Sequence, residues 1–254
     1  MRVGFAGAGN MAAAMARGWA AGDGGPKAML FCDLEAERAR ALAAEVGGQT
    51  RSGLRELAGD SDVLVLAVKP AALDEVATQL GGAAPALITV LAATPTERIA
   101  EAFPGVPALR VMPNQPVEVR RGVLCYVMPE AMPDELKESL LALLGLLGTL
   151  IPVEERQIDA AMAIMSSSPA YIALVAEALA RGGEREGLEP GLAGELVAGT
   201  LAGTAELLLK RDPATIRNAV ASPGGATEAG LAHLEGVVED AFTNAINASL
   251  ERVR

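Results

Sequence analysis

The sequence predicts a doubly wound α/β domain followed by a second domain built only of helices. Up to about residue 152, short apolar runs alternate with amphipathic segments, and the runs are continuously apolar. Continuously apolar strands are typical of a parallel sheet that helices cover on both faces. From Glu154 onward the chain shows no strand-like run and reads as successive helices rich in Ala, Leu and Glu. We therefore expect one domain at 1–152 and another at 153–254.

The alternation in the first domain can be followed element by element. Apolar runs of the strand type lie at 2–7, 28–33, 62–68, 86–93, 107–112, 122–128 and 149–153. Segments with the apolar period of a surface helix lie at 10–21, 35–46, 70–80, 95–103 and 134–148. A strand, a crossover helix and a second parallel strand form the βαβ unit, so this order predicts a sheet with helical crossovers.

The composition favours a protein that acts on a small molecule. The chain has 254 residues, 51% of them hydrophobic, which is enough for one large core or two modest ones. Its formal charge of -11 opposes binding to nucleic acid or to anionic lipid. No uncharged apolar run approaches the ~20 residues of a membrane span, and the N-terminus enters a strand directly instead of showing a signal sequence. We expect a cytoplasmic protein with no nucleic-acid or membrane partner.

Metal and disulfide chemistry are not expected. Cys32 and Cys125 each lie in an apolar strand-like run, where a buried thiol is the simplest interpretation. His233 is the only histidine, so a zinc site with several histidine ligands is excluded. We expect His233 on a helix surface and no metal in the site.

The first apolar run ends in a glycine pattern that predicts a dinucleotide site. Gly7, Gly9 and Ala12 fit G-x-G-x-x-[G/A] after a strand and at the start of a helix. Gly7 permits a tight turn, and Gly9 removes a side chain where a pyrophosphate approaches the backbone of the helix N-terminus. Asp33 closes the second run, near the ~20-residue separation expected of an acid that binds a ribose diol. A tight strand-to-helix turn without a ligand is the alternative.

A second glycine pair lies in the segment "SPGGAT" at 222–227. Gly224 and Gly225 follow a proline and precede a predicted helix, whose first N–H groups lack intrahelical partners and whose dipole favours an anion. A Pro-Gly-Gly break standing alone is usually a turn. Position alone therefore leaves both a turn and an anion site open.

Five segments, taken in this order, resemble pyrroline-5-carboxylate reductase. They are "GAGNMA" at 7–12, "LAVKP" at 66–70, "RVMPNQP" at 110–116, "SSSPAYIALVAEALA" at 166–180 and "NAVASPGGATEAGLAHLE" at 218–235. The resemblance spans the whole chain, and the last segment is the most specific. It implies reduction of the C=N bond of 1-pyrroline-5-carboxylate to L-proline with hydride from NADPH or NADH. It also implies a Rossmann-type first domain and a helical second domain that interlocks in a homodimer.

The resemblance assigns residues to the site as well. It implies that Ser222, Gly224 and Gly225 hold the substrate carboxylate, and that Ser167 lines the same pocket. Thr227 is implied near the ring nitrogen as the catalytic residue, where its hydroxyl positions and relays a proton. The cofactor is expected at Gly7, Gly9, Asn10, Met11, Asp33, Ala67, Lys69 and Asn114.

Three departures from the usual sequence of that family leave the substrate open. Residues 165–168 read Met-Ser-Ser-Ser where the family usually has Ser-Gly-Ser-Gly, Thr94-Pro95 stands in place of a glycine and an aliphatic residue, and Gln115 replaces a threonine. Added Cβ atoms and hydroxyls at positions of close approach can shrink a pocket or shift a cofactor. A reductase of another cyclic imine or imino acid, and a non-catalytic dinucleotide-binding paralogue, therefore stay open as alternatives.

Asp33 and the helical half of the chain give two further expectations. A carboxylate at the end of the second strand repels the 2'-phosphate of NADP and binds a free ribose, so NADH is the expected donor, although Arg38 or Arg40 could reach a phosphate from the next helix. The segments 170–180 and 191–209 carry more apolar surface than one helical layer buries. We therefore expect at least a homodimer.

Overall fold

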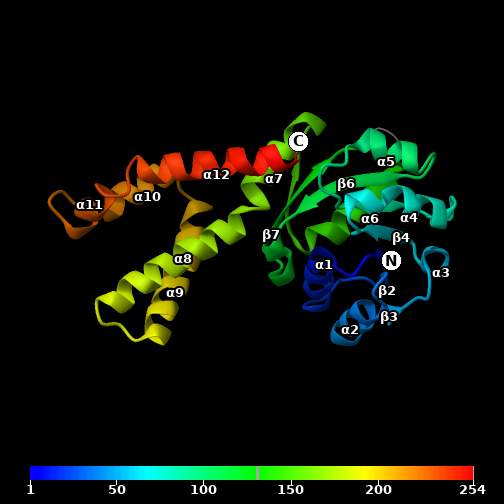
Figure 1. Ribbon diagram of the computed structural model, residues 1–254, viewed down its shortest axis with the longest axis horizontal. Coiled ribbons are helices and arrows are strands. Elements are labelled where there is room, and N and C mark those ends of the chain that lie inside the picture. Colours follow the sequence, from blue (N-terminus) through cyan, green and yellow to red (C-terminus); the bar gives the residue numbers. More distant parts are fainter. Residues whose placement is uncertain (130–131, 254) are drawn as a thin grey trace. The chain divides into compact units, whose positions relative to one another are not determined.

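The computed structural model describes residues 1–129 and 132–253, and its first compact unit is built on an eight-stranded sheet (Figure 1). The strand order is β3-β2-β1-β4-β5-β6-β7-β8. The strands are β1 (Arg2–Ala6), β2 (Ala28–Cys32), β3 (Gln49–Thr50), β4 (Val63–Leu66), β5 (Leu87–Thr89), β6 (Ala108–Pro113), β7 (Gly122–Val127) and β8 (Gly148–Pro152). Neighbouring strands run parallel except β6 and β7, which are antiparallel.

The chain winds outward from β1 to β2 and β3, and then returns to place β4 on the other side of β1. This reversal makes the switch point of a doubly wound sheet, where a crevice opens outside the carboxyl ends of the strands. The predicted α/β class is therefore confirmed. The helices of this unit are α1 (Asn10–Ala20), α2 (Ala36–Val46), α3 (Leu54–Asp60), α4 (Leu73–Leu80), α5 (Thr96–Ala102), α6 (Asp134–Gly145) and α7 (Ile158–Met165). The described part of this unit also has three short 3-10 helices, η1 (Pro70–Ala72) before α4, η2 (Gln115–Val119) between β6 and β7, and η3 (Glu155–Gln157) before α7.

Alternate residues of the central strands β1, β2, β4 and β5 contribute to two separate core layers. Val3 and Phe5 of β1 pack into the layer under α1, α2 and α6, whereas Ala6 packs into the layer under α3, α4 and α5. The same alternation divides β4, where Val65 joins the first layer and Leu66 the second. Because side chains alternate with a period of two, a strand that is apolar throughout serves both faces of the sheet.

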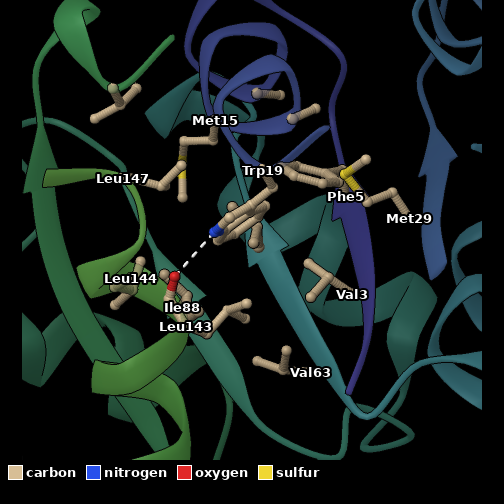
Figure 2. Packing of buried hydrophobic residues seen from close by; sticks show 14 of the residues in the cluster. Val3, Phe5, Met15, Trp19, Met29, Val63, Ile88, Leu143, Leu144 and Leu147 are labelled. Carbon is tan, nitrogen blue, oxygen red and sulfur yellow. Dashed lines mark hydrogen bonds between the residues drawn. The ribbon is translucent and has the colours of Figure 1, made fainter. Parts of the chain in front are cut away.

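Trp19 is the aromatic centre of the first layer (Figure 2). Its ring lies near Phe5, with centroids 5.9 Å apart, and Phe5 stacks on Phe31 at 5.0 Å. The indole Nε1–H donates to the carbonyl oxygen of Leu143 at 2.9 Å, so its one polar group is satisfied within the core. This bond also ties α1 to α6 across the layer.

The first unit runs from Met1 to Ser167 and also takes in Val253, whereas the sequence predicted a boundary after residue 152. The extra length is η3 and α7, which pack against the far end of the sheet. Ile158 and Met162 of α7 join a third apolar cluster with Met112 of β6 and Cys125 of β7. The amphipathic helix α7 therefore packs on the sheet of the first unit, although its sequence resembles that of the helices that follow it.

The second compact unit, Ser168–Arg252, is all-helical as predicted. Its helices are α8 (Ser168–Arg185), α9 (Pro190–Leu208), α10 (Pro213–Val220), α11 (Ala226–Leu231) and α12 (Val237–Val253). Figure 1 shows α8 and α9 side by side, and the rings of Tyr171 and Phe242 bring α8 against α12 with centroids 6.2 Å apart. Apolar side chains stay exposed in the single chain, as at Leu174 (60%) and Leu196 (52%).

One helical stretch, Glu155–Arg185, is long and apolar enough to cross a membrane by length and composition, with a mean hydropathy of 1.4. The expectation that no run of this kind exists is therefore wrong. Core helices of soluble proteins meet the same criterion, and here the stretch is divided into η3, α7 and α8. Of its most apolar window, 17% is buried within the described chain.

Candidate functional site

Three aligned strand ends place the predicted cofactor residues beside one another. In the sheet register Ala6 of β1 pairs with Cys32 of β2 and with Leu66 of β4. The residues that follow these strand ends are therefore neighbours at one edge. Gly7 donates its N–H to the carbonyl oxygen of Cys32 at 2.8 Å, and Ala67 donates to that of Ala6 at 2.9 Å.

Gly7 is required by the fold itself. Its φ of +98° lies in the region that side-chain-bearing residues rarely adopt. A Cβ at this position would also lie 2.6 Å from the carbonyl oxygen of Ala67, which is backbone and cannot move aside cheaply. The first glycine of the pattern is thus explained by the turn between β1 and α1.

Gly9 is not explained by the fold. It is the N-cap of α1 with extended backbone angles, φ −75° and ψ −173°, which any residue adopts. A Cβ here would meet no heavy atom of the described residues within 4 Å. The space is open, and α1 begins without a side-chain cap among those residues. The first-turn N–H groups of α1 therefore face a space that fits a phosphate.

Asp33 holds the glycine loop from the end of β2. Its Oδ2 accepts the N–H of Ala8 at 2.7 Å, and its Oδ1 accepts the N–H of Glu35 at 2.8 Å. The side chain is 10% exposed. Both carboxylate oxygens thus fix the backbone on either side of the switch point, a role that sequence reasoning did not foresee for this acid.

A cavity of about 640 Å³ opens where these strand ends meet. This volume lies within the range of roughly 300–1,000 Å³ that small-molecule and cofactor sites occupy. Of the predicted cofactor residues, Gly7, Gly9, Asp33, Ala67 and Lys69 line it. Asn10 instead lines an adjoining hollow of about 510 Å³, and Met11 packs against the first core layer.

Sequence reasoning missed much of the cavity wall. Ser52, Gly53 and Leu54 line it from the loop between β3 and the start of α3. The sequence predicted neither element, because β3 is two polar residues long and both are exposed. Further lining comes from Glu75, Val76 and Gln79 of α4. The amphipathic pattern of α4 was recognised, but nothing in a single helix pattern says which residues face a ligand.

Cys32 also lines the cavity, at the last position of β2. Burial raises the pKa of this thiol, and the neighbouring carboxylates of Asp33 and Glu56 raise it further. The group therefore stays a neutral thiol at neutral pH and contributes an apolar surface to the wall.

The rim of the cavity carries a charged pair on α2 and the loop before it. Arg38 lines the cavity, and its Nη2 lies 2.6 Å from Oε1 of Glu35. Its Nη1 lies 3.7 Å from Oδ1 of Asp33. Among the described residues that line the cavity, the guanidinium of Arg38 therefore already faces two carboxylates.

Asn114 lies directly after β6, and both polar atoms of its side chain make a hydrogen bond. Its Oδ1 accepts the N–H of Val123 at 2.9 Å, and its Nδ2 donates to the carbonyl oxygen of Met165 at 3.1 Å. The residue is buried. It thereby joins β6, β7 and the end of α7, which brings the half-buried Ser167 to the same region of the first unit.

A polar joint that the sequence did not reveal lies next to this region. The guanidinium of Arg110, on β6, is 3% exposed and pairs with the carboxylate of Glu155. Oε2 of Glu155 also accepts the hydroxyl of Thr96 at 2.6 Å, and Oε1 accepts its N–H at 3.3 Å. A lone arginine within an apolar strand was the available signal, because such a residue needs a buried partner.

In the second unit, the glycine pair of the "SPGGAT" segment forms a turn before α11. Gly224 has a φ of +72°, and a Cβ on Gly225 would lie 2.6 Å from Oγ of Ser222. The turn closes with a hydrogen bond of 2.9 Å from the N–H of Gly225 to the carbonyl oxygen of Ser222. The turn therefore accounts for both glycines.

A carboxylate already contacts this turn, and it belongs to the chain. The N–H of Gly224 donates to Oε2 of Glu228 at 2.7 Å. Thr227 is exposed in the first turn of α11, whose N-cap is Gly225, so a capping role does not explain the threonine. The backbone N–H of the turn is thus able to hold a carboxylate, and Thr227 nearby is exposed.

Two family models match the chain. Residues 155–254 match the one described as pyrroline-5-carboxylate reductase dimerisation, and residues 2–93 match the one described as NADP oxidoreductase, coenzyme F420-dependent. The second model covers β1 through β5, and the first begins at η3 and continues through the helical unit.

Relatives named pyrroline-5-carboxylate reductase extend these matches over most of the chain. The pyrroline-5-carboxylate reductase of Synechocystis sp. is 39% identical over 204 residues, which cover 78% of this chain and 76% of that protein. That of Pseudomonas aeruginosa is 35% identical over 269 residues, covering 98% and 96%. The crystal structure of the Plasmodium falciparum pyrroline carboxylate reductase with NADP bound is 26% identical, with a TM-score of 0.87 and coverage of 100% of this chain and 97% of that one.

Proposed function

This chain belongs to the pyrroline-5-carboxylate reductase family, and on that premise we propose that it reduces the C=N bond of 1-pyrroline-5-carboxylate to L-proline with NADH or NADPH. Full-length similarity to reductases of that name supports the reaction. The observation that carries the nucleotide part is Gly9, whose missing side chain the fold does not need and whose surroundings are open.

The residues of the switch point would hold the cofactor. The first-turn N–H groups of α1, beginning at Asn10 and Met11, offer donors to the pyrophosphate, and Gly9 lets it approach the backbone. Ala67 and Lys69, which follow the end of β4, line the same cavity, and the positive charge of Lys69 suits an anionic cofactor. When bound, the nicotinamide supplies the hydride that the imine carbon accepts.

On the substrate side, the proposal rests on the "SPGGAT" turn, together with Ser167. The substrate carboxylate takes the N–H of Gly224 in place of Glu228, with Gly225 and Ser222 beside it. Thr227 then holds a proton at the ring nitrogen through its hydroxyl, which orients the imine and does not act as a strong acid. Asn114 would support the cofactor indirectly, because its bonds to Val123 and Met165 fix the end of β6. Holding the two reacting carbons together contributes most of the rate, since proximity supplies roughly 7–11 kcal/mol.

We further propose that NADH is the preferred donor. A carboxylate at the end of β2 lines the cavity in Asp33, and a second one follows it in Glu35. The Plasmodium falciparum relative was solved with NADP, so the preference is a property to be measured on this chain. Steady-state kinetics with both cofactors measure it, and a kcat/KM that favours NADPH tenfold or more contradicts the assignment.

The helical unit, Ser168–Arg252, is proposed as the substrate-binding and dimerisation domain of at least a homodimer. The family model matched there bears the name of that dimerisation, and the exposed apolar residues of α8 and α9 supply the surface. Light scattering at micromolar concentration tests this assembly, and a monodisperse monomer contradicts it. We place the enzyme in the cytoplasm, where its two free cysteines, Cys32 and Cys125, stay reduced.

The reaction is tested by following NADH absorbance with 1-pyrroline-5-carboxylate and a panel of other cyclic imines. The expected result is turnover with 1-pyrroline-5-carboxylate at the highest kcat/KM of the panel. If another imine is preferred, the chain is a reductase of that imine, and the triplet Ser166–Ser168 is the expected cause of the altered substrate pocket. Nucleotide binding without turnover on any imine would identify a non-catalytic member of the family.

A further inference from the structure

Resting on the proposed nucleotide site, we propose that Glu35 sets the choice between NADH and NADPH by holding the guanidinium of Arg38. Arg38 is the arginine that lines the cavity within the described part of the chain. A guanidinium is the side chain best suited to bind a phosphate, because its planar fork matches two phosphate oxygens. The affinity for a 2'-phosphate therefore depends on whether the Arg38 guanidinium is already paired with a carboxylate.

The geometry shows that Arg38 is already engaged. Its Nη2 donates to Oε1 of Glu35 at 2.6 Å, the length of a charge-assisted hydrogen bond, and its Nη1 faces Asp33 at 3.7 Å. A 2'-phosphate that bound Arg38 would have to displace the carboxylate of Glu35. It would also bring a charge of about −2 toward two carboxylates that stay nearby.

The sequence analysis assigned the discrimination between NADH and NADPH to Asp33 alone, but the structure gives Asp33 and Glu35 different contacts. Both oxygens of Asp33 accept backbone N–H groups, from Ala8 and from Glu35, so this carboxylate is fixed and shapes the glycine loop. The Glu35 side chain is 69% exposed and makes no cap bond at the start of α2 among the residues described. Glu35 is therefore the carboxylate that can be exchanged without loosening the loop.

The experiment compares two nucleotides that differ by one phosphate, AMP and adenosine 2',5'-bisphosphate. Their Kd values are measured by calorimetry on the full chain at fixed ionic strength, so the readout does not depend on catalysis. In Glu35→Gln, the Kd of the bisphosphate is expected to fall at least about tenfold. The 2'-phosphate can then form charge-assisted bonds to Arg38 without first breaking an ion pair. The Kd of AMP stays within twofold.

A matched control lies two residues further along. Glu37 pairs with Arg40 at the same i,i+3 spacing, on the same helix and with the same 2.6 Å contact, but neither residue lines the cavity. Glu37→Gln removes the same charge, so it should leave both Kd values unchanged. An equal gain in this control would mean that net charge alone is responsible, and the proposal would be overturned.

A second variant tests the path through Arg38. In Glu35→Gln combined with Arg38→Gln, the gain for the bisphosphate is expected to disappear, and kcat/KM with NADPH relative to NADH should return to the wild-type ratio. A persisting gain would overturn the role of Arg38. If the single variant binds both nucleotides with the wild-type ratio, the inference fails while the proposed function stands. If neither nucleotide binds to any form, the proposed function fails with it.

Discussion

The two glycines of the first loop predict opposite outcomes for the same substitution. In Gly7→Ala, a side-chain-bearing residue is forced to a φ of +98° and its Cβ to 2.6 Å from a carbonyl oxygen. The backbone conformation alone costs roughly 1–2 kcal/mol, and the contact with fixed backbone adds to it, so we expect a loss of about 2–4 kcal/mol in the free energy of unfolding. This variant should be visibly less stable in urea.

In Gly9→Ala, the backbone is already extended and the new methyl enters open space. The free energy of unfolding should stay within about 0.5 kcal/mol of wild type, or rise slightly because the unfolded chain loses freedom. The methyl, however, occupies the space proposed for the pyrophosphate. The Kd of NADH, followed by fluorescence, should therefore rise at least about tenfold, a loss of about 1.4 kcal/mol.

Gly59→Ala provides the control for both variants, because Gly59 is an exposed residue of α3 with open space around its Cβ position and away from the cavity. It should leave the Kd of NADH unchanged. Wild-type NADH binding by Gly9→Ala would refute the placement of the pyrophosphate. Wild-type stability of Gly7→Ala would refute the account of the turn.

Three further predictions concern single side chains. Thr227→Ala should lower kcat and kcat/KM together with little change in Tm, since Thr227 is not at the N-cap position of α11 and makes no side-chain cap bond there among the described residues; a fall in Tm with unchanged turnover per folded molecule contradicts the catalytic role. Asn114→Ala should cost about 1–3 kcal/mol in urea unfolding, because it strands the N–H of Val123 and the carbonyl of Met165; equal stability would show that water replaces the amide. Cys32 should react with iodoacetamide more slowly at pH 8 than a cysteine in the urea-unfolded chain, because burial raises its pKa; equal rates by mass spectrometry contradict this.

The strands and long helices of the first unit were predictable because their signal is local. Each strand of three or more residues is an apolar run, and α2 and α4 end at Gly47 and Gly81, which adopt left-handed angles. The segment β3–α3 was missed because a two-residue exposed strand carries no apolar pattern. The boundary between the units differs from the predicted one because α7 packs on the sheet, and a helix pattern alone does not reveal its packing partner.

The cofactor side of the site was predictable where the position of a residue at a strand end determines its neighbours. Gly7 and Asp33 follow strand ends, and parallel strand ends meet at one edge, so their proximity could be inferred from order alone. The hydrogen-bond partners of individual side chains could not be inferred in this way. Nothing in the sequence says that Asp33 accepts the N–H of Ala8, or that Glu228 contacts the N–H of Gly224, since these bonds depend on distances of a few tenths of an ångström.

The joint between Arg110 and Glu155 has a consequence for how relatives of this chain diverge. Within the described residues, Nε of Arg110 has no hydrogen-bond partner, and its Nη1 pairs with the carboxylate of Glu155. Removing one member of such a pair costs roughly 3–5 kcal/mol, whereas replacing both by apolar residues is often neutral. A relative can therefore lose this ion pair without a large loss of stability only if both positions are substituted in close succession. In an alignment of relatives, positions 110 and 155 should behave as one inherited character, although one lies in a strand and the other in the turn before α7.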